Sequence, residues 1–244
     1  MVFHLNKGLV SSLSTPPHTL ILDYSTSRIG TPTIEPWVGK WGGVTSLFID
    51  TEESFPLDLS ENGYTHVVHS GSELSINEPA PFTKRAKAFI QSATQKGVAQ
   101  MGICYGAQLI CMSLVGGEAV RASPKGFEAG WGEIRFNAEG QGLLGVHPVE
   151  RVWQHHFDEV VLLPEGAIEL ATNEHTAIQA WVSPAQRLFG TQFHPEVVRR
   201  MGNKIFRKDR QLLEENGYDL EQIVLKGPSP KIGNAIFDYF IGSI

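Results

Sequence analysis

Short apolar runs alternate with segments of helical spacing through the first half of the chain. Three runs bounded by turn-forming residues are predicted to be buried strands: residues 19–24, 47–50 and 65–71. Residues 82–96 carry apolar side chains at helical spacing, and Gly97 follows where a helix would stop. Pro32 and Pro36 interrupt residues 24–43, so we expect a loop there with at most a short helix. This alternation predicts a parallel sheet covered on both faces.

From Gly116 onward the pattern changes to short strand-like pieces separated by Gly, Pro and Asn, which predicts antiparallel hairpins. The pieces cover residues 118–121, 131–136, 160–163, 168–171 and 178–182. A strand at 188–194, a helix at 197–215 and a last helix at 232–241 complete the chain. The predicted fold is therefore a three-layer α/β sandwich with a mostly parallel central sheet and a small antiparallel section.

No repeat or low-complexity linker divides the chain. We therefore predict a leader at 1–18, one domain at 19–200, and a helical extension at 201–244 that packs on the same domain.

Composition narrows the class of protein. The chain has 244 residues, 41% of them hydrophobic and 19% charged, as in ordinary globular proteins. A net charge of −6 argues against nucleic acid as the main partner. We find no signal peptide and no apolar stretch of the roughly 20 residues that a membrane span needs, so a cytoplasmic location without membrane contact is expected. The two cysteines do not form a disulfide framework, and Cys111 is expected to be a buried core residue.

Cys104 lies at the apex of a predicted strand–turn–helix with the spacing G-x-C-x-G. Gly102 and Gly106 remove the Cβ atoms that would collide in so sharp a turn. The thiol also lies at a helix N-terminus, where the helix dipole and unpaired N–H groups stabilise negative charge. A thiolate nucleophile is therefore expected at Cys104, with the amide of Tyr105 directed at a developing oxyanion.

His194-Pro195-Glu196 supplies the groups that such a nucleophile needs. Pro195 favours an extended backbone at His194, and residues two apart in an extended segment face the same side. Glu196 is therefore expected to orient the His194 ring, leaving the other ring nitrogen to exchange a proton with a thiol. A metal site that adds His155, His156 and Asp158 is the alternative, but neighbouring histidines on a strand point to opposite sides. We therefore predict neither a metal nor a cofactor.

The two motifs together resemble the class I glutamine amidotransferases of the triad type. Residues 102–108 are similar to the family's nucleophile motif, and residues 190–197 are similar to its base motif. The resemblance covers roughly residues 20–197 and implies a flavodoxin-like arrangement. It implies that Cys104 attacks the side-chain amide of glutamine, that His194 with Glu196 transfers the proton to ammonia, and that water hydrolyses a γ-glutamyl thioester. Gln108 matches the glutamine that contacts the substrate.

Two segments depart from the family pattern. The segment ending in Gly71 occupies the place of the turn whose backbone N–H completes the oxyanion hole, but Ser72 and Glu73 replace its second glycine and its proline. The resemblance implies backbone oxyanion donors at Gly71, Ser72 and Tyr105. Residues 153–160 are similar to a family segment near the substrate, which implies substrate contacts at His156 and Phe157, where Phe157 replaces a glycine.

Three functions are consistent with these residues. The first is a glutaminase that releases ammonia for an unidentified acceptor, either free or to a separate synthetase subunit as partner. The nearest resemblance is to stand-alone proteins like the amidotransferase domain of GMP synthase. The second is a γ-glutamyl peptidase that uses the same triad on a γ-glutamyl peptide or conjugate. The third is a non-catalytic regulatory protein, which the intact Cys104, His194 and Glu196 disfavour.

Overall fold

The computed structural model describes residues 16–56 and 62–244. Most of the predicted leader at 1–18 therefore lies outside the described residues. Within them the chain forms a nine-stranded sheet in the order β2-β1-β3-β4-β11-β10-β9-β6-β7 and a two-stranded antiparallel sheet of β5 and β8.

The first five strands of the large sheet are parallel, and they place the site. They are β2 (Gly43–Phe48), β1 (His18–Asp23), β3 (His66–His69), β4 (Ala99–Ile103) and β11 (Leu188–Thr191). Side chains alternate between the two faces, so Leu20 and Leu22 join one core cluster and Ile21 joins the other. A sheet buried on both faces explains why these strands read as nearly continuous apolar runs.

Antiparallel strands extend the sheet beyond β11. They are β10 (Ala180–Ser183), β9 (Ile168–Thr172), β6 (Glu128–Phe136) and β7 (Val149–His156). The small sheet pairs β5 (Val120–Ala122) with β8 (Asp158–Val160), and the 3₁₀ turns are η1 (Glu52–Ser54) and η2 (Gly117–Ala119). The fold predicted from the sequence, an α/β architecture with a parallel core and an antiparallel section, is confirmed.

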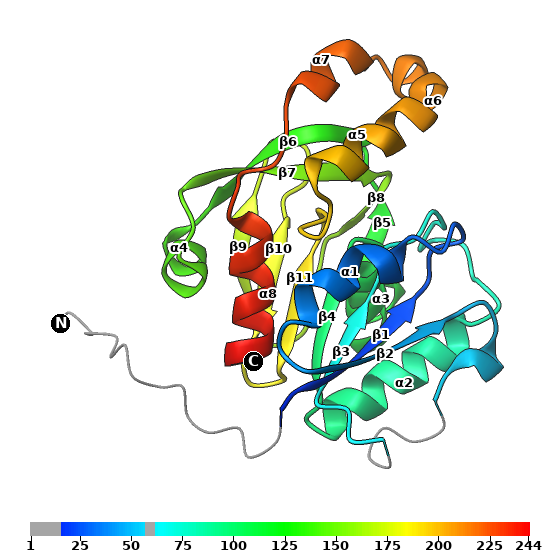
Figure 1. The fold of residues 1–244 in the computed structure, drawn as a ribbon. Coiled ribbons are helices and arrows are strands. Elements are labelled where there is room, and N and C mark those ends of the chain that lie inside the picture. The colour runs from blue at the N-terminus through cyan, green and yellow to red at the C-terminus, as the bar shows by residue number, and fades with distance from the viewer. Residues whose placement is uncertain (1–15, 57–61) are drawn as a thin grey trace.

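Helices cover both faces of the parallel strands, as Figure 1 shows. α2 (Thr83–Gln95) and α3 (Tyr105–Leu114) pack on one face, while α1 (Gly30–Val38) and α8 (Ile232–Ser243) pack on the other. α1 is the short helix within the proline-rich segment. It forms because Pro32 occupies the first turn, where no N–H partner is lost, and because Ser25 Oγ accepts the amides of Ile29 and Gly30.

A group of three helices lies over β6 and β7, at the top of the view in Figure 1. They are α5 (Arg199–Lys208), α6 (Arg210–Glu215) and α7 (Leu220–Leu225), and they enclose a third core cluster around Trp131, Trp153 and Phe206. The residues after 200 therefore divide between this group and α8, which packs against α1. The domain boundaries stay a prediction.

Several element boundaries differ from the sequence-based expectation. The single helix expected at 197–215 is interrupted at Asp209, and the strand expected at 188–194 ends at Thr191. Strand β7, helix α4 (Ala138–Leu144) and helix α7 were not predicted. The two helices carry local signals: Asn137 accepts the amide of Gly140, and the Asp219 side chain caps α7. No helix among residues 16–56 and 62–244 is long and apolar enough to span a membrane.

Candidate active site

The residues singled out in the sequence follow the carboxyl ends of three neighbouring parallel strands. Gly71 follows β3, Cys104 follows β4 and His194 follows β11. Thr191 pairs with Ile103 across β11 and β4, and His69 pairs with Gly102 across β3 and β4. The three segments therefore leave the sheet at the same level and meet above its edge.

Cys104 has a strained backbone at the junction of β4 and α3, with φ 51° and ψ −111°. Its amide donates to Thr191 O at 2.7 Å, which ties the turn to β11. A Cβ at Gly102 would overlap the backbone of Ala107, and one at Gly106 would overlap the carbonyl of His69. The two glycines therefore let α3 start against the sheet, while the positive φ holds Cys104 in the bend.

His194 lies beside this turn and is fixed from two sides. Its Nδ1 is 2.7 Å from Glu196 Oε1, and its ring meets the Trp153 ring edge-on with centroids 4.8 Å apart. The sequence predicted that an extended segment would bring Glu196 to His194, but the structure differs. Residues 195–196 form a turn, in which the amide of Val197 donates to His194 O.

The charge state of His194 follows from these neighbours. Burial by itself lowers the pKa of His194, but the negative charges of Glu196 and Cys104, and hydrogen bonds with both, raise it to about 10. The arrangement therefore favours the imidazolium form of His194.

Gln192 was missed by the sequence-based reasoning. Its Nε2 donates to Cys104 Sγ at 3.7 Å, and its Oε1 accepts from Gln108 Nε2 at 3.2 Å. Gln108 also donates to Asp158 O at 2.9 Å, so its amide group is held by the protein on the donor side. The signal was present in the base motif, because Gln192 stands two residues before His194. The direction of the Gln192 side chain, however, depends on how the chain continues after β11, beside β4.

The turn after β3 lies against His194. A Cβ at Gly71 would be 2.6 Å from His194 Cε1, so any larger residue there would displace the His194 ring. Ser72 Oγ donates to Tyr24 O at 2.9 Å, and the Glu73 carboxylate accepts from the amide of Thr26 at 2.8 Å and from Ser27 Oγ. The two residues that depart from the family pattern therefore anchor the turn to the segment before α1.

His156 is buried, and both of its ring nitrogens contact protein groups. Nε2 is 3.0 Å from Glu128 Oε2, and Nδ1 is 3.1 Å from Asp158 O. His155, on the opposite side of β7, pairs with Asp209 at 3.2 Å, a contact that sequence reasoning also missed. Within the described parts of the chain no cluster of three or more His, Cys, Asp or Glu side chains is placed to hold a metal ion.

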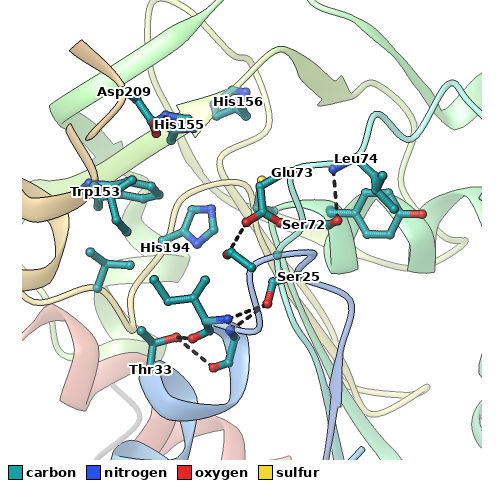
Figure 2. A pocket seen from close by; sticks show the side chains of 18 of the residues that line it. Ser25, Thr33, Ser72, Glu73, Leu74, Trp153, His155, His156, His194 and Asp209 are labelled. Atoms are coloured by element: carbon teal, nitrogen blue, oxygen red, sulfur yellow. Dashed lines mark hydrogen bonds and ion pairs between the residues drawn. The ribbon is translucent and has the colours of Figure 1, made fainter. Parts of the chain in front are cut away.

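A cavity of about 860 Å³ opens at Cys104 and His194. Figure 2 shows Trp153, His155 and Asp209 on one side of it and Ser72, Glu73 and Leu74 on the other, with His194 between them. Gly71, Gln108, His156 and Phe157 also line this cavity. The residues singled out in the sequence for catalysis, oxyanion binding and substrate contact therefore meet in one pocket.

Comparisons with known proteins agree with this arrangement. The family model described as "Glutamine amidotransferase class-I" matches residues 49–211. The chain is 36% identical over 149 residues to a glutamine-hydrolysing GMP synthase of Symbiobacterium thermophilum, covering 60% of this chain and 28% of that protein. It is 30% identical over 158 residues to a subunit of the glutamine-hydrolysing GMP synthase of Sulfurisphaera tokodaii, and the match covers 65% of this chain and 79% of that subunit. The chain thus spans less than a third of the first relative's length.

Solved structures share the fold. A glutamine amidotransferase from Thermotoga maritima superposes with a TM-score of 0.77 at 20% identity, covering 94% of this chain and all of that one. A glutamine amidotransferase from Methylobacillus flagellatus gives a TM-score of 0.69 at 23% identity, and the match covers 93% of this chain and 91% of that one. With the family model spanning well over half of its length, the chain belongs to the class-I glutamine amidotransferases, homologous to the glutamine-hydrolysing domains of GMP synthases.

Proposed function

We propose that the protein hydrolyses the side-chain amide of glutamine, with Cys104 as nucleophile, His194 as acid–base and Glu196 as the group that orients His194. The observation that carries this proposal is the strained Cys104 beside a His194 ring that Glu196 holds at 2.7 Å. A nucleophile, a base in its neighbourhood and an orienting carboxylate are the parts that acyl transfer requires.

The reaction follows from these positions. The Cys104 thiolate attacks the amide carbon, and the oxyanion accepts hydrogen bonds from backbone N–H groups at Gly71, Ser72 and Tyr105. His194 gives its proton to the departing nitrogen, so the C–N bond breaks and ammonia leaves a γ-glutamyl thioester. His194 then takes a proton from water, which attacks the thioester and releases glutamate and the thiolate. Glutamine and water are thus converted to glutamate and ammonia.

Ammonia release from glutamine tests the proposal. The wild-type protein is expected to release ammonia, Cys104→Ala to release none, and His194→Ala to be slower by about 10³-fold or more. Cys111→Ala is the matched control, because Cys111 lies on α3, the helix that begins after Cys104, is fully buried, and has a pKa that burial raises. If wild type and Cys104→Ala are equally inactive, alone and with candidate synthetases, the proposal is wrong.

A separate synthetase is proposed as the partner subunit that accepts the ammonia. Support comes from the Sulfurisphaera tokodaii relative, which is named as one subunit of a glutamine-hydrolysing GMP synthase and of which this chain covers 79%. The measurement is glutamine-dependent amination by a candidate synthetase with and without this protein. Because the proposed nucleophile must stay reduced, we also propose the cytoplasm as its compartment, which a fluorescent fusion would test.

A γ-glutamyl hydrolase is the second candidate. The cavity of about 860 Å³ lies near the upper end of the range for ligand pockets and extends from Cys104 to α5 and α6, well beyond what one glutamine fills. A panel of γ-glutamyl peptides tests this candidate, and it fails if all of them are left intact while glutamine is hydrolysed.

A further inference from the structure

One part of the cavity is not explained by glutamine. We call it the α5 subsite, and it is lined by Phe157, Met201, Lys204, Ile205, Lys208 and Leu212. Four of these residues lie on α5 at spacings of three and four, so they form one face of the helix. This face is directed at the same cavity that contains Cys104 and His194.

The opposite face of α5 fixes its orientation. A Cβ at Gly202 would be 2.6 Å from Trp153 Cδ1, so the helix backbone lies directly on the indole. Asn203 Oδ1 accepts from Trp131 Nε1 at 2.9 Å, and the Phe206 side chain is fully buried. Rotation of α5 would break these contacts, and the subsite is therefore preformed.

The subsite has an apolar wall. Phe157 is 46% exposed although its ring stacks on Phe127, with centroids 4.4 Å apart and an interplanar angle of 15°. Half-buried Met201, Ile205 and Leu212 line the cavity with it. An exposed aromatic ring held by a second ring in a concave site is suited to an apolar ligand group.

Among the charged side chains that line the α5 subsite, those without an ion-pair partner are positive. Every acidic side chain that lines the cavity is engaged by a protein group: Glu73, Asp158, Glu196 and Asp209. The ammonium group of Lys204 makes no hydrogen bond or ion pair with any other residue in the described segments. Lys208 adds a second ammonium group one turn later, next to Asp209. A ligand that reaches this wall is therefore expected to carry a negative group.

We propose that the α5 subsite binds the amine portion of a γ-glutamyl amide formed with an apolar amino acid, with its carboxylate at Lys204 and its side chain against Phe157. This inference rests on the proposed attack of Cys104 on γ-glutamyl amides. The C–S bond forms first, and the γ C–N bond then breaks as the amino acid leaves with the proton of His194. Water then cleaves the thioester, so a γ-glutamyl amino acid and water become glutamate and the free amino acid.

Hydrolysis of matched substrates tests the subsite. The comparison uses γ-glutamyl-phenylalanine, its carboxamide, γ-glutamyl-lysine and glutamine. The free acid is expected to have the highest kcat/KM, about fivefold above its carboxamide, as for an exposed ion pair. Lys204→Glu is expected to abolish that preference, and Phe157→Ala to lower kcat/KM for γ-glutamyl-phenylalanine about tenfold. Arg200→Glu is the matched control, because Arg200 is an exposed α5 residue outside the cavity.

A binding experiment separates this inference from the proposed reaction. In the Cys104→Ala background, calorimetry is expected to show weaker binding of γ-glutamyl-phenylalanine after Lys204→Glu but not after Arg200→Glu. Equal affinities in the two variants, or a carboxamide that binds as well as the free acid, would overturn the subsite. If glutamine is still hydrolysed by the parent protein in that case, the proposed function stands. If no substrate is cleaved but binding discriminates as expected, the proposed function fails and the subsite stands.

Discussion

The side-chain amide of Gln192 lies against the thiol of Cys104, with Nε2 3.7 Å from Sγ, although the two residues follow different strands. The opposite end of the same amide accepts from Gln108, so Gln192 cannot turn away without losing that bond. Both glutamines are 2% exposed. A buried N–H donor at this position stabilises negative charge on sulfur and holds the thiol in one direction.

Gln192→Met is therefore expected to slow alkylation of Cys104 by iodoacetamide about tenfold at neutral pH, because one buried hydrogen bond to a charged group is lost. The measurement is the alkylation rate from pH 5 to 9, and half-maximal reactivity should move to higher pH. Gln211→Met, on the exposed side of α6, is the control. An unchanged pH profile would assign Gln192 a purely structural role.

The raised pKa of His194 predicts a pH dependence of stability. Burial lowers this pKa, but Glu196 and Cys104 raise it to about 10, above the value of 6.5 for an exposed histidine. The stabilisation is complete below pH 6.5 and is lost as the pH rises through about 10. Wild type should lose stability over this window more steeply than His194→Gln, as measured by denaturant unfolding at each pH. Parallel curves for the two proteins would contradict the ion pair.

Gly71→Ala is expected to reduce glutamine hydrolysis about 100-fold while the protein stays folded. The added methyl group would stand 2.6 Å from His194 Cε1, and a displacement of about 1 Å at a catalytic group costs this much. Steady-state kinetics and a thermal melt together check it. Gly142→Ala is the control, since no atom lies within 4 Å of its Cβ position and alanine favours the α4 helix. Full activity of Gly71→Ala would show that His194 is free to move.

Asp209 connects the α5–α6 junction to the site. It pairs with His155, whose ring stacks on Trp153 at 5.2 Å, and Trp153 in turn meets His194. Asp209→Asn should therefore raise KM severalfold for γ-glutamyl substrates and change kcat less, because the variant loosens a cavity wall and leaves the proposed triad in place. Steady-state kinetics check this, with Asp219→Asn at the α7 cap as control. An unchanged KM would disconnect the helices from substrate binding.

The hydrogen bond from His155 lowers the pKa of Asp209, which adds a second test of the same contact. A lowered carboxyl pKa contributes stability above its unfolded value near 3.8, and this is lost as the pH falls through the lower folded value. The difference in thermal stability between wild type and Asp209→Asn is therefore expected to shrink in acid. A constant difference down to pH 2 would argue against the pair.

The fold class and the sharp turn at Cys104 could be predicted from the order of residues, because both depend on local rules. Strand and helix periods show in the order of apolar residues, and Gly102 and Gly106 show a sharp turn around Cys104 without knowledge of any neighbour. The contact between His194 and Glu196 was also predictable, since the two residues are separated by only one position. The backbone conformation between His194 and Glu196 was not predictable, because a turn and an extended segment both bring the two side chains together.

The contacts of the remaining polar residues depend on how the chain folds in three dimensions. His155 and His156 are adjacent in the chain, yet one pairs with Asp209 and the other with Glu128. Gln192 reaches Cys104 only because β11 lies beside β4, and α5 faces the cavity only because Gly202 packs on Trp153. These contacts join residues far apart in the chain, so they depend on the order of the strands and on how the helices dock. A local pattern of residues predicts neither.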